Sequence, residues 1–130
     1  MNIVDCLKEK KAFISLQGAD ERAIENSEKA LGVKFAKEYK NYVKAFGAAS
    51  YYGHELTGVS NAPAIDVVAV TTQERDFSGD IPADWYVIEQ AHIDGIVFWQ
   101  DKKGIIHKTG PGSKPVKVCD SLLEYINKES

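Results

Sequence analysis

The chain of 130 residues is poor in the features that mark secreted and membrane proteins. It has two cysteines, Cys6 and Cys119, near opposite ends. A disulfide joining the ends is conceivable, but two reduced thiols in a cytoplasmic protein are the favoured interpretation. Residues 1–11 lack the apolar core of a signal peptide. No apolar run approaches the roughly 20 residues needed to cross a bilayer. We therefore expect a cytoplasmic protein without a membrane partner.

The sequence also lacks a constellation typical of catalysis or metal binding. Its three histidines, His54, His92 and His107, are scattered, and no Cys-x-x-Cys occurs. His92 and Asp94 could supply two ligands, but a metal site needs three or four. Cys119 with His107 could mimic a thiol protease pair, but a buried structural thiol is the usual case. We predict no enzyme, no metal and no cofactor.

Basic residues are almost absent from the middle of the chain. Residues 66–101 contain one base, Arg75. The same residues contain eight acids: Asp66, Glu74, Asp76, Asp80, Asp84, Glu89, Asp94 and Asp101. Five lysines and no acid then follow over residues 102–117. Such an acidic block repels nucleic acid and attracts basic partners, although a solvated face with no partner is the alternative.

Two helices are the clearest elements of the sequence. Asp20 is a suitable N-cap for the first helix, and Gly32 is placed to end it. The second helix ends at Gly47 and carries one apolar stripe at helical spacing. The stripe consists of Phe35, Tyr39, Tyr42, Val43 and Phe46. Glu28 lies inside this packed pair, where a hydrogen bond to a loop backbone is favoured over catalysis.

The remaining segments predict a sheet covered by helices. A short helix is expected over residues 2–12, a connection over 13–18, and a loop over 48–58 leading into a short strand near 55–57. Residues 66–77 fit either a β-branched strand or a helix capped by Asp66. Strands are expected over residues 85–90, 96–100, 105–109 and 116–118, followed by a helix capped by Asp120 or Ser121. The prediction is one α+β domain, residues 1–130, with an antiparallel sheet of about four to five strands packed by helices.

The helix pair resembles the N-terminal signature of the SUKH superfamily, which includes the yeast Smi/Knr cell-wall regulators and many bacterial immunity proteins. The run reads Ile24-Glu25-x-x-Glu28-x-x-Leu31-Gly32-Val33-x-Phe35-x-x-x-Tyr39-x-x-Tyr42-Val43-x-x-Phe46-Gly47. Residues 81–88 and 121–126 are similar to later family segments, and Asp94-Gly95 is a reduced form of the family's turn. The family usually has proline where Ala36 stands. Proline there only presets φ and removes an N–H that is expected to have no partner, so alanine should be tolerated.

The resemblance implies helix over residues 66–77 and a protein-binding function. The first hypothesis is an immunity protein that neutralises a cognate toxin, commonly a nuclease, of a polymorphic or contact-dependent system. The alternative is a non-catalytic regulatory scaffold like the yeast relatives. A basic nuclease would be complementary to an acidic face. The predicted face contains Glu74, Asp76, Asp80 and Asp84, with Tyr51 or Tyr52 as an exposed aromatic anchor beside it.

Overall fold

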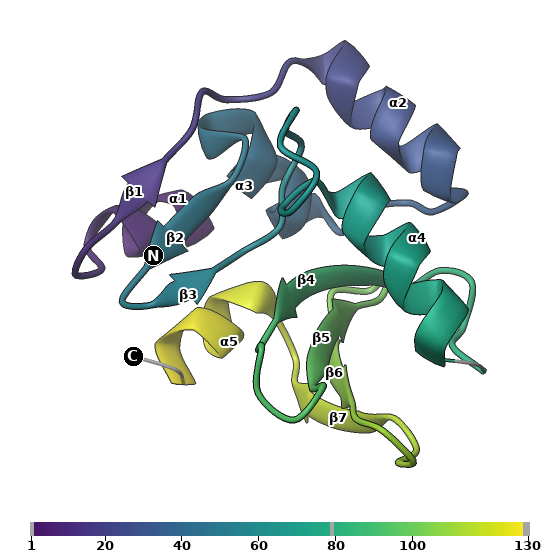
Figure 1. Cartoon of the computed structure of the whole chain (residues 1–130). Helices are drawn as coiled ribbons and strands as arrows, with labels where there is room; N and C mark the ends of the chain where they lie inside the picture. The colour runs from purple at the N-terminus through teal and green to yellow at the C-terminus, as the bar shows by residue number, and fades with distance from the viewer. Residues whose placement is uncertain (1, 79, 129–130) are drawn as a thin grey trace.

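The computed structural model describes residues 2–78 and 80–128 (Figure 1). The helices are α1 (Ile3–Lys8), α2 (Glu21–Leu31), α3 (Lys37–Phe46), α4 (Val67–Ser78) and α5 (Leu122–Lys128). The strands are β1 (Ile14–Ser15), β2 (Ala49–Tyr51), β3 (His54–Glu55), β4 (Tyr86–Gln90), β5 (Val97–Gln100), β6 (Ile106–Thr109) and β7 (Val116–Cys119). They form two antiparallel sheets, β1-β2-β3 and β4-β5-β6-β7, so the predicted α+β fold is confirmed.

The predicted helix pair is present with its expected ends. Asp20 Oδ1 accepts a hydrogen bond from Ala23 N at 2.8 Å, and Gly32 ends α2 in the left-handed region at φ 69°. The stripe of α3 is buried, and Phe46 packs edge-on against Phe13 with ring centroids 4.9 Å apart. The ring contact packs the end of α3 against the segment that leads into β1.

One expectation about the start of α3 was wrong. The N–H of Ala36 does have a partner, because it donates to the Tyr86 hydroxyl at 2.9 Å. That hydroxyl in turn donates to Gln100 Oε1, also at 2.9 Å. Proline at position 36 would remove the first of these buried hydrogen bonds. Alanine is therefore the residue that lets α3 bond to β4.

The expected loop over residues 48–58 contains a β-hairpin instead. Tyr51 pairs with His54, so only Tyr52 and Gly53 form the turn between β2 and β3. Both turn residues have positive φ, 45° and 83°, as a tight hairpin turn of the primed type requires. Tyrosine is not typical of the first of these positions, which explains why the turn was missed. The predicted connection over residues 13–18 likewise contributes β1, which pairs with β2.

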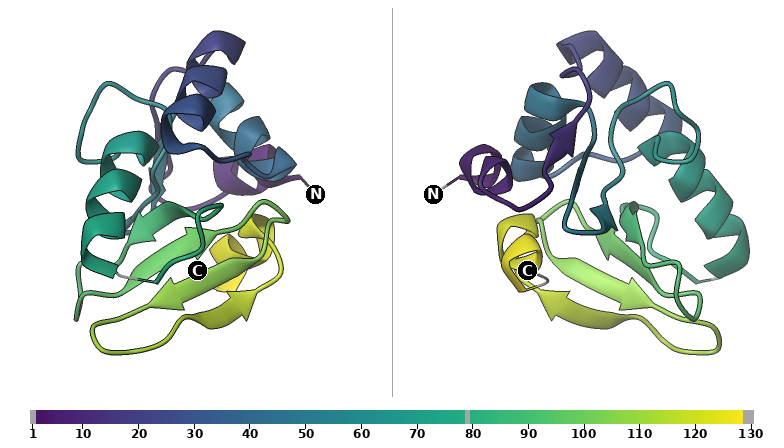
Figure 2. Two further views of the ribbon diagram at one scale, coloured as in Figure 1. Left: turned by 90° about the vertical axis from the view of Figure 1, so that its right-hand side faces the viewer. Right: turned by 60° about the vertical axis from the view of Figure 1, so that its left-hand side comes forward.

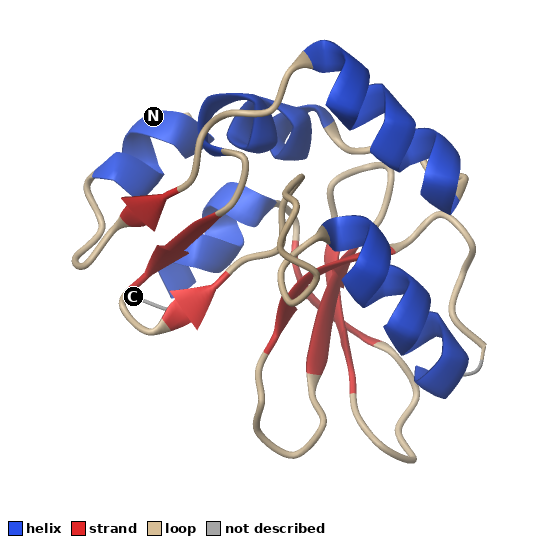
Figure 3. Cartoon of the chain, turned by 45° about the horizontal axis from the view of Figure 1, so that its top comes forward, coloured by secondary structure: helices blue, strands red, loops and turns tan. Residues whose placement is uncertain are grey.

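Thr57 joins the two sheets, which Figure 3 shows as separate groups of strands. Its N–H donates to Ile88 O at 2.8 Å, and its hydroxyl donates to Val87 O at 2.7 Å. Because that hydroxyl has one proton, Tyr39 must be the donor in the 2.8 Å bond between Tyr39 OH and Thr57 Oγ1. The hydroxyl of Tyr42 donates to Thr57 O at 2.7 Å. One buried residue thus bonds to β4 and α3 together.

Residues 67–78 are helical, as the family resemblance implied. Asp66 Oδ2 accepts from Ala69 N at 3.3 Å and caps α4. Val67 and Val70 are buried, and Thr71 Oγ1 accepts from Val87 N at 3.0 Å. Two views in Figure 2 place α4 on one side of the four-stranded sheet and α5 on the other. The sheet is therefore covered on both faces.

The side chains of the four-stranded sheet divide between its two faces. Tyr86, Ile88 and Ile106 join the larger core with α3 and α5. Val87, Val97 and Trp99 form a smaller core with Trp85 and Val70 of α4. At the start of α5, Ser121 is the cap, since its Oγ accepts from Glu124 N at 3.1 Å. Glu38 of α3 adds a second cap by accepting from Leu122 N and Leu123 N.

Replacing Thr57 by valine tests the junction between the sheets. Thr57→Val keeps the branched shape but leaves the Tyr39 hydroxyl and the Val87 carbonyl without their buried partner. We expect the free energy of unfolding in urea to fall by about 1–3 kcal/mol. Thr72→Val, on the exposed side of α4, is the control and should change stability by less than about 0.5 kcal/mol. Equal effects of the two substitutions would contradict the junction.

Candidate functional site

A groove of about 780 Å³ lies beside the C-terminal half of α4. We call it the α4 groove. Its walls are α4, the β4–β5 loop and the β6–β7 loop, and the end of β4 and the start of β5 lie between them. The residues used below are Glu74, Phe77, Asp80, Ile81, Gln90, His92, Gly95, Ile96, Pro111 and Lys114, all of which line it.

The two loops of the groove are held against each other. Gly95 has φ 69°, and a Cβ built there would lie 2.9 Å from Pro111 Cγ. His92 and Asp94, in the same β4–β5 loop, also have positive φ, 59° and 55°. Histidine and aspartate are among the residues that adopt this region most readily after glycine and asparagine, so these positive φ values mark tight turns of the loop. The groove therefore has a defined backbone wall on this side.

The carboxylates of α4 and the following segment are not neutralised. Glu74 Oε2 accepts a hydrogen bond from Gln90 Nε2 at 2.7 Å, which holds this half-buried side chain against β4. Asp76 and Asp80 are exposed. Within residues 2–78 and 80–128, none of these three acids forms an ion pair with a basic side chain.

Arg75, the single base in the acidic block, is engaged elsewhere. Its guanidinium donates to the carbonyl oxygens of Leu31, Ala83 and Trp85 at 3.1, 3.1 and 3.4 Å. These bonds tie α4 to the end of α2 and to the segment before β4. Since its hydrogen bonds go to carbonyl oxygens, Arg75 forms no ion pair with the acids that the structure describes beside it.

The structure gathers only part of the predicted acidic face. Glu74 and Asp80 line the α4 groove, and Asp76 lies exposed on the same helix. Asp84 lies by a second hollow of about 600 Å³ between α2 and the turn after β5. Its Oδ2 accepts from Lys102 N at 3.4 Å. The first three acids therefore belong to α4 and its end, and Asp84 lies on a neighbouring surface.

Tyr51 is wrong as an aromatic anchor. It belongs to β2, is 0% exposed, and stacks on His54 with ring centroids 5.1 Å apart. Tyr52 is exposed, 59%, as predicted for one of the pair. However, it belongs to the β2–β3 turn, which lies across the molecule from the end of α4 in Figures 1 and 3. The expected tyrosine beside the acids is therefore not there.

Phe77 is the aromatic residue that lies beside the acids. It is 79% exposed and lines the α4 groove with Glu74 and Asp80. Phe77 lies at helical spacing from Val67 and Val70, which are both buried. The first two turns of α4 pack on β4, whereas the last turn borders the open groove. No signal in the sequence marks the residue at which α4 stops packing against the sheet.

The other candidate residues have structural partners. His107 Nε2 lies 3.0 Å from Asp101 Oδ2, and its ring stacks on Trp85 at 4.0 Å. Burial alone would raise the pKa of Asp101, but the hydrogen bonds from His107, Ile105 N and Lys103 N outweigh it and lower that pKa. Burial raises the pKa of the Cys119 thiol. Cys6 and Cys119 are both buried free thiols.

Glu28 has the role that the sequence favoured for it. Its Oε2 accepts a hydrogen bond from Phe35 N at 2.8 Å, and Lys40 Nζ lies 3.6 Å from the same oxygen. This carboxylate closes the link between α2 and α3. In the part of the chain that the structure describes, no group of three or more histidine, cysteine or acidic residues could hold a metal ion.

The chain forms an α+β fold with a groove beside α4. A family described as SUKH_5, SMI1-KNR4 cell-wall, matches residues 1–109, and the chain belongs to this family. The expected SUKH membership is thereby confirmed. Comparison with curated proteins gives no match. Membership supports a role in protein–protein interaction, since such domains are generally non-catalytic and are commonly immunity proteins.

Among the described helices, none has the length and apolar character required to span a bilayer.

Metal analysis of the purified protein tests the candidate ligands. His92 and Asp94 are both exposed in the β4–β5 loop, and two ligands do not make a stable site. We expect no stoichiometric metal after equilibration with zinc and gel filtration, in the protein and in its His92→Ala variant alike. One zinc per chain that is lost in His92→Ala would contradict this assignment.

Proposed function

We propose that the protein is an immunity protein that binds and neutralises a cognate bacterial toxin of a polymorphic or contact-dependent system. The toxin is a nuclease with a basic surface, and the complex forms in the cytoplasm. The observation that supports this proposal most is the unneutralised acidic surface of α4 in a domain of the SUKH superfamily. The proposed role needs a tight complex and no catalytic turnover.

Charge complementarity gives the proposal its physical basis. A nuclease is basic where it holds the phosphates of its substrate. An acidic protein surface attracts such a partner over distances comparable to the Debye length and speeds the encounter. It also repels nucleic acid. The inhibitor therefore competes with the nucleic-acid substrate for the toxin, and it does not itself bind that substrate.

The proposed binding face includes Glu74, Asp76 and Asp80. Asp84 lies on the neighbouring surface toward α2, and Tyr52, on the hairpin turn across the molecule (Figure 1), is not part of this face. Arg75 supports this face by bonding to carbonyl oxygens instead of pairing with the neighbouring acids. The face is carried by a helix that is fixed to the sheet, so binding requires little ordering of the backbone.

A regulatory scaffold is the second candidate, because the description of the matching family names the cell wall. The two functions differ in genetic context and in effect on a toxin. A toxin gene directly beside the gene for this protein, and protection of cells that express that toxin, support the immunity function. If this protein does not protect cells that express such a toxin, the scaffold function is favoured.

Charge reversal tests the binding face. We expect Glu74→Lys, Asp76→Lys and Asp80→Lys in combination to slow association with the toxin and to flatten the dependence of the association rate on salt. Charges at the rim of an interface act mainly on the association rate. Stopped-flow fluorescence at several salt concentrations measures both quantities.

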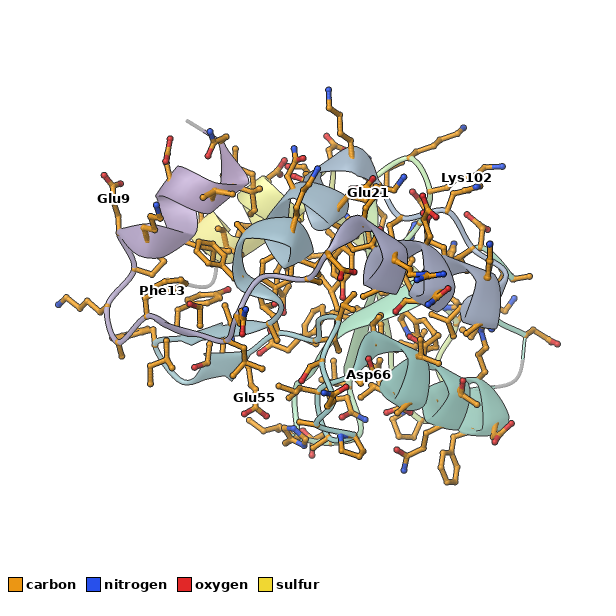
Figure 4. The ribbon with its side chains drawn as sticks, turned by 90° about the horizontal axis from the view of Figure 1, so that it is seen from above. Glu9, Phe13, Glu21, Glu55, Asp66 and Lys102 are labelled. Carbon is orange, nitrogen blue, oxygen red and sulfur yellow. The ribbon has the colours of Figure 1, made fainter. Side chains whose placement is uncertain are left out.

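A matched control separates local from overall charge. Asp5→Lys, Glu9→Lys and Glu55→Lys change the net charge by the same amount at three exposed positions that line neither hollow. Figure 4 shows Glu9 and Glu55 on the part of the molecule away from the end of α4. Urea unfolding checks that both triple variants fold. If both variants associate with the toxin at the same rate, α4 is not the binding face.

A further inference from the structure

We propose that the α4 groove receives a segment of the partner protein in which an arginine or lysine stands next to a large apolar side chain. This proposal adds the site and the chemistry of the bound segment to the proposed function. It rests on the proposed function in one respect, namely that the partner is the toxin. Nothing in the acidic sequence block predicted an apolar component. That component comes from the groove itself.

The apolar part of the groove is open to a partner. Phe77 is 79% exposed at the rim, and Ile81, Ile96 and Pro111 also line the groove. A large aromatic side chain left exposed beside a hollow is typical of an anchor in a protein interface. The volume of about 780 Å³ is in the range of sites that enclose a drug-sized group, which corresponds to a few side chains. The groove therefore fits a short segment better than a flat surface.

The charges of the groove select a basic segment. Glu74 and Asp80 lie on the α4 side, and neither has a basic partner among the described residues. Lys114 lies on the opposite side, in the β6–β7 loop. A cationic side chain near Glu74 and Asp80 is attracted, and a backbone carbonyl of the same segment can accept from Lys114. A phosphate or an acidic segment would be repelled by the α4 side.

The backbone of the groove is already in place for binding. Hydrogen bonds from Ala91 N to Ile96 O at 3.0 Å and from Ile96 N to Ile93 O at 3.1 Å close the β4–β5 loop, and Gly95 in this loop lies close to Pro111 of the β6–β7 loop. The hydrogen bond from Gln90 to Glu74 fixes that carboxylate. Because the backbone of a preorganised site is ordered before binding, little conformational entropy is lost when a partner binds. Even a short segment can therefore bind.

Three synthetic peptides of equal length test the chemistry. One alternates arginine with leucine, one alternates arginine with serine, and one alternates glutamate with leucine. Each is titrated to about 1 mM, near the weakest affinity that such a titration resolves, while ¹H–¹⁵N NMR follows the backbone amides. We expect the arginine–leucine peptide to move the amides of Phe77, Gly95 and Gly112. The arginine–serine peptide should bind about tenfold more weakly, and the glutamate–leucine peptide should leave these amides unmoved.

Two pairs of variants locate the binding. Phe77→Ala and Asp80→Asn should each weaken the arginine–leucine peptide about tenfold. Tyr52→Ala and Glu9→Gln are the matched controls, since they alter an exposed aromatic residue and an exposed acid that do not line the groove, and they should leave affinity unchanged. Unmoved groove amides, equal binding of the glutamate–leucine peptide, or equal losses in the controls would each overturn the proposal. Concentration-dependent shifts of the groove amides without peptide would also overturn it, because a second copy would then occupy the groove.

Protection assays with the toxin distinguish the two proposals. If the wild-type protein neutralises the toxin and Phe77→Ala with Asp80→Asn does so equally well, the groove proposal fails while the immunity function stands. If the wild-type protein does not neutralise the toxin and the peptide still moves the groove amides, the immunity function fails while the groove proposal stands.

Discussion

The structure depends on the hydrogen bonds that Thr57 makes between its two sheets. Four polar groups meet at this residue: the Ile88 and Val87 carbonyls and the Tyr39 and Tyr42 hydroxyls. All of them are buried, where an unpaired polar group is unfavourable. Losing any one hydrogen bond of this set would therefore destabilise the fold. Burial raises the pKa of Tyr39 and Tyr42, which therefore stay protonated at neutral pH and keep the protons that they donate.

The position of α4, and with it the proposed binding face, follows from this junction. Gly58 comes directly after Thr57, and its N–H and carbonyl bond to Ile65 and Val67 at the start of α4. A Cβ at Gly58 would lie 1.9 Å from Gly47 O, so the chain passes here only because residue 58 has no side chain. Thr71 and Arg75 then fix the rest of the helix to β4 and to the end of α2. A rigid mounting of this kind suits a protein that works by presenting a surface.

The sequence predicted those parts of the fold that local rules determine. A cap, a C-terminal glycine and one apolar stripe were enough for α2 and α3, and alternating apolar runs were enough for the strands of the larger sheet. The β2–β3 hairpin was missed because Tyr52 occupies a turn position that usually holds asparagine, aspartate or glycine. The partner of the Ala36 N–H was missed because it comes from β4, fifty residues later.

The candidate site was predictable only in its charge. The acidic block is visible in the sequence. Where its carboxylates lie, however, depends on how far α4 extends beyond the part of the helix that packs on β4. Thus Asp84 lies by a different hollow, Tyr51 is buried in the core, and Phe77 is exposed although it lies at helical spacing from the buried Val67 and Val70. These outcomes depend on tertiary packing, which periodicity along one element does not contain.

Hydrogen exchange of the backbone amides with and without the cognate toxin tests the central claim most directly. The claim is that one face, formed by the end of α4 and the two loops beside it, makes the complex. We predict slower exchange on binding in residues 73–78, 92–96 and 110–115, with no change in β1 and β2. Protection confined to β1, β2 or α2, with exchange at the end of α4 unchanged, would contradict the account.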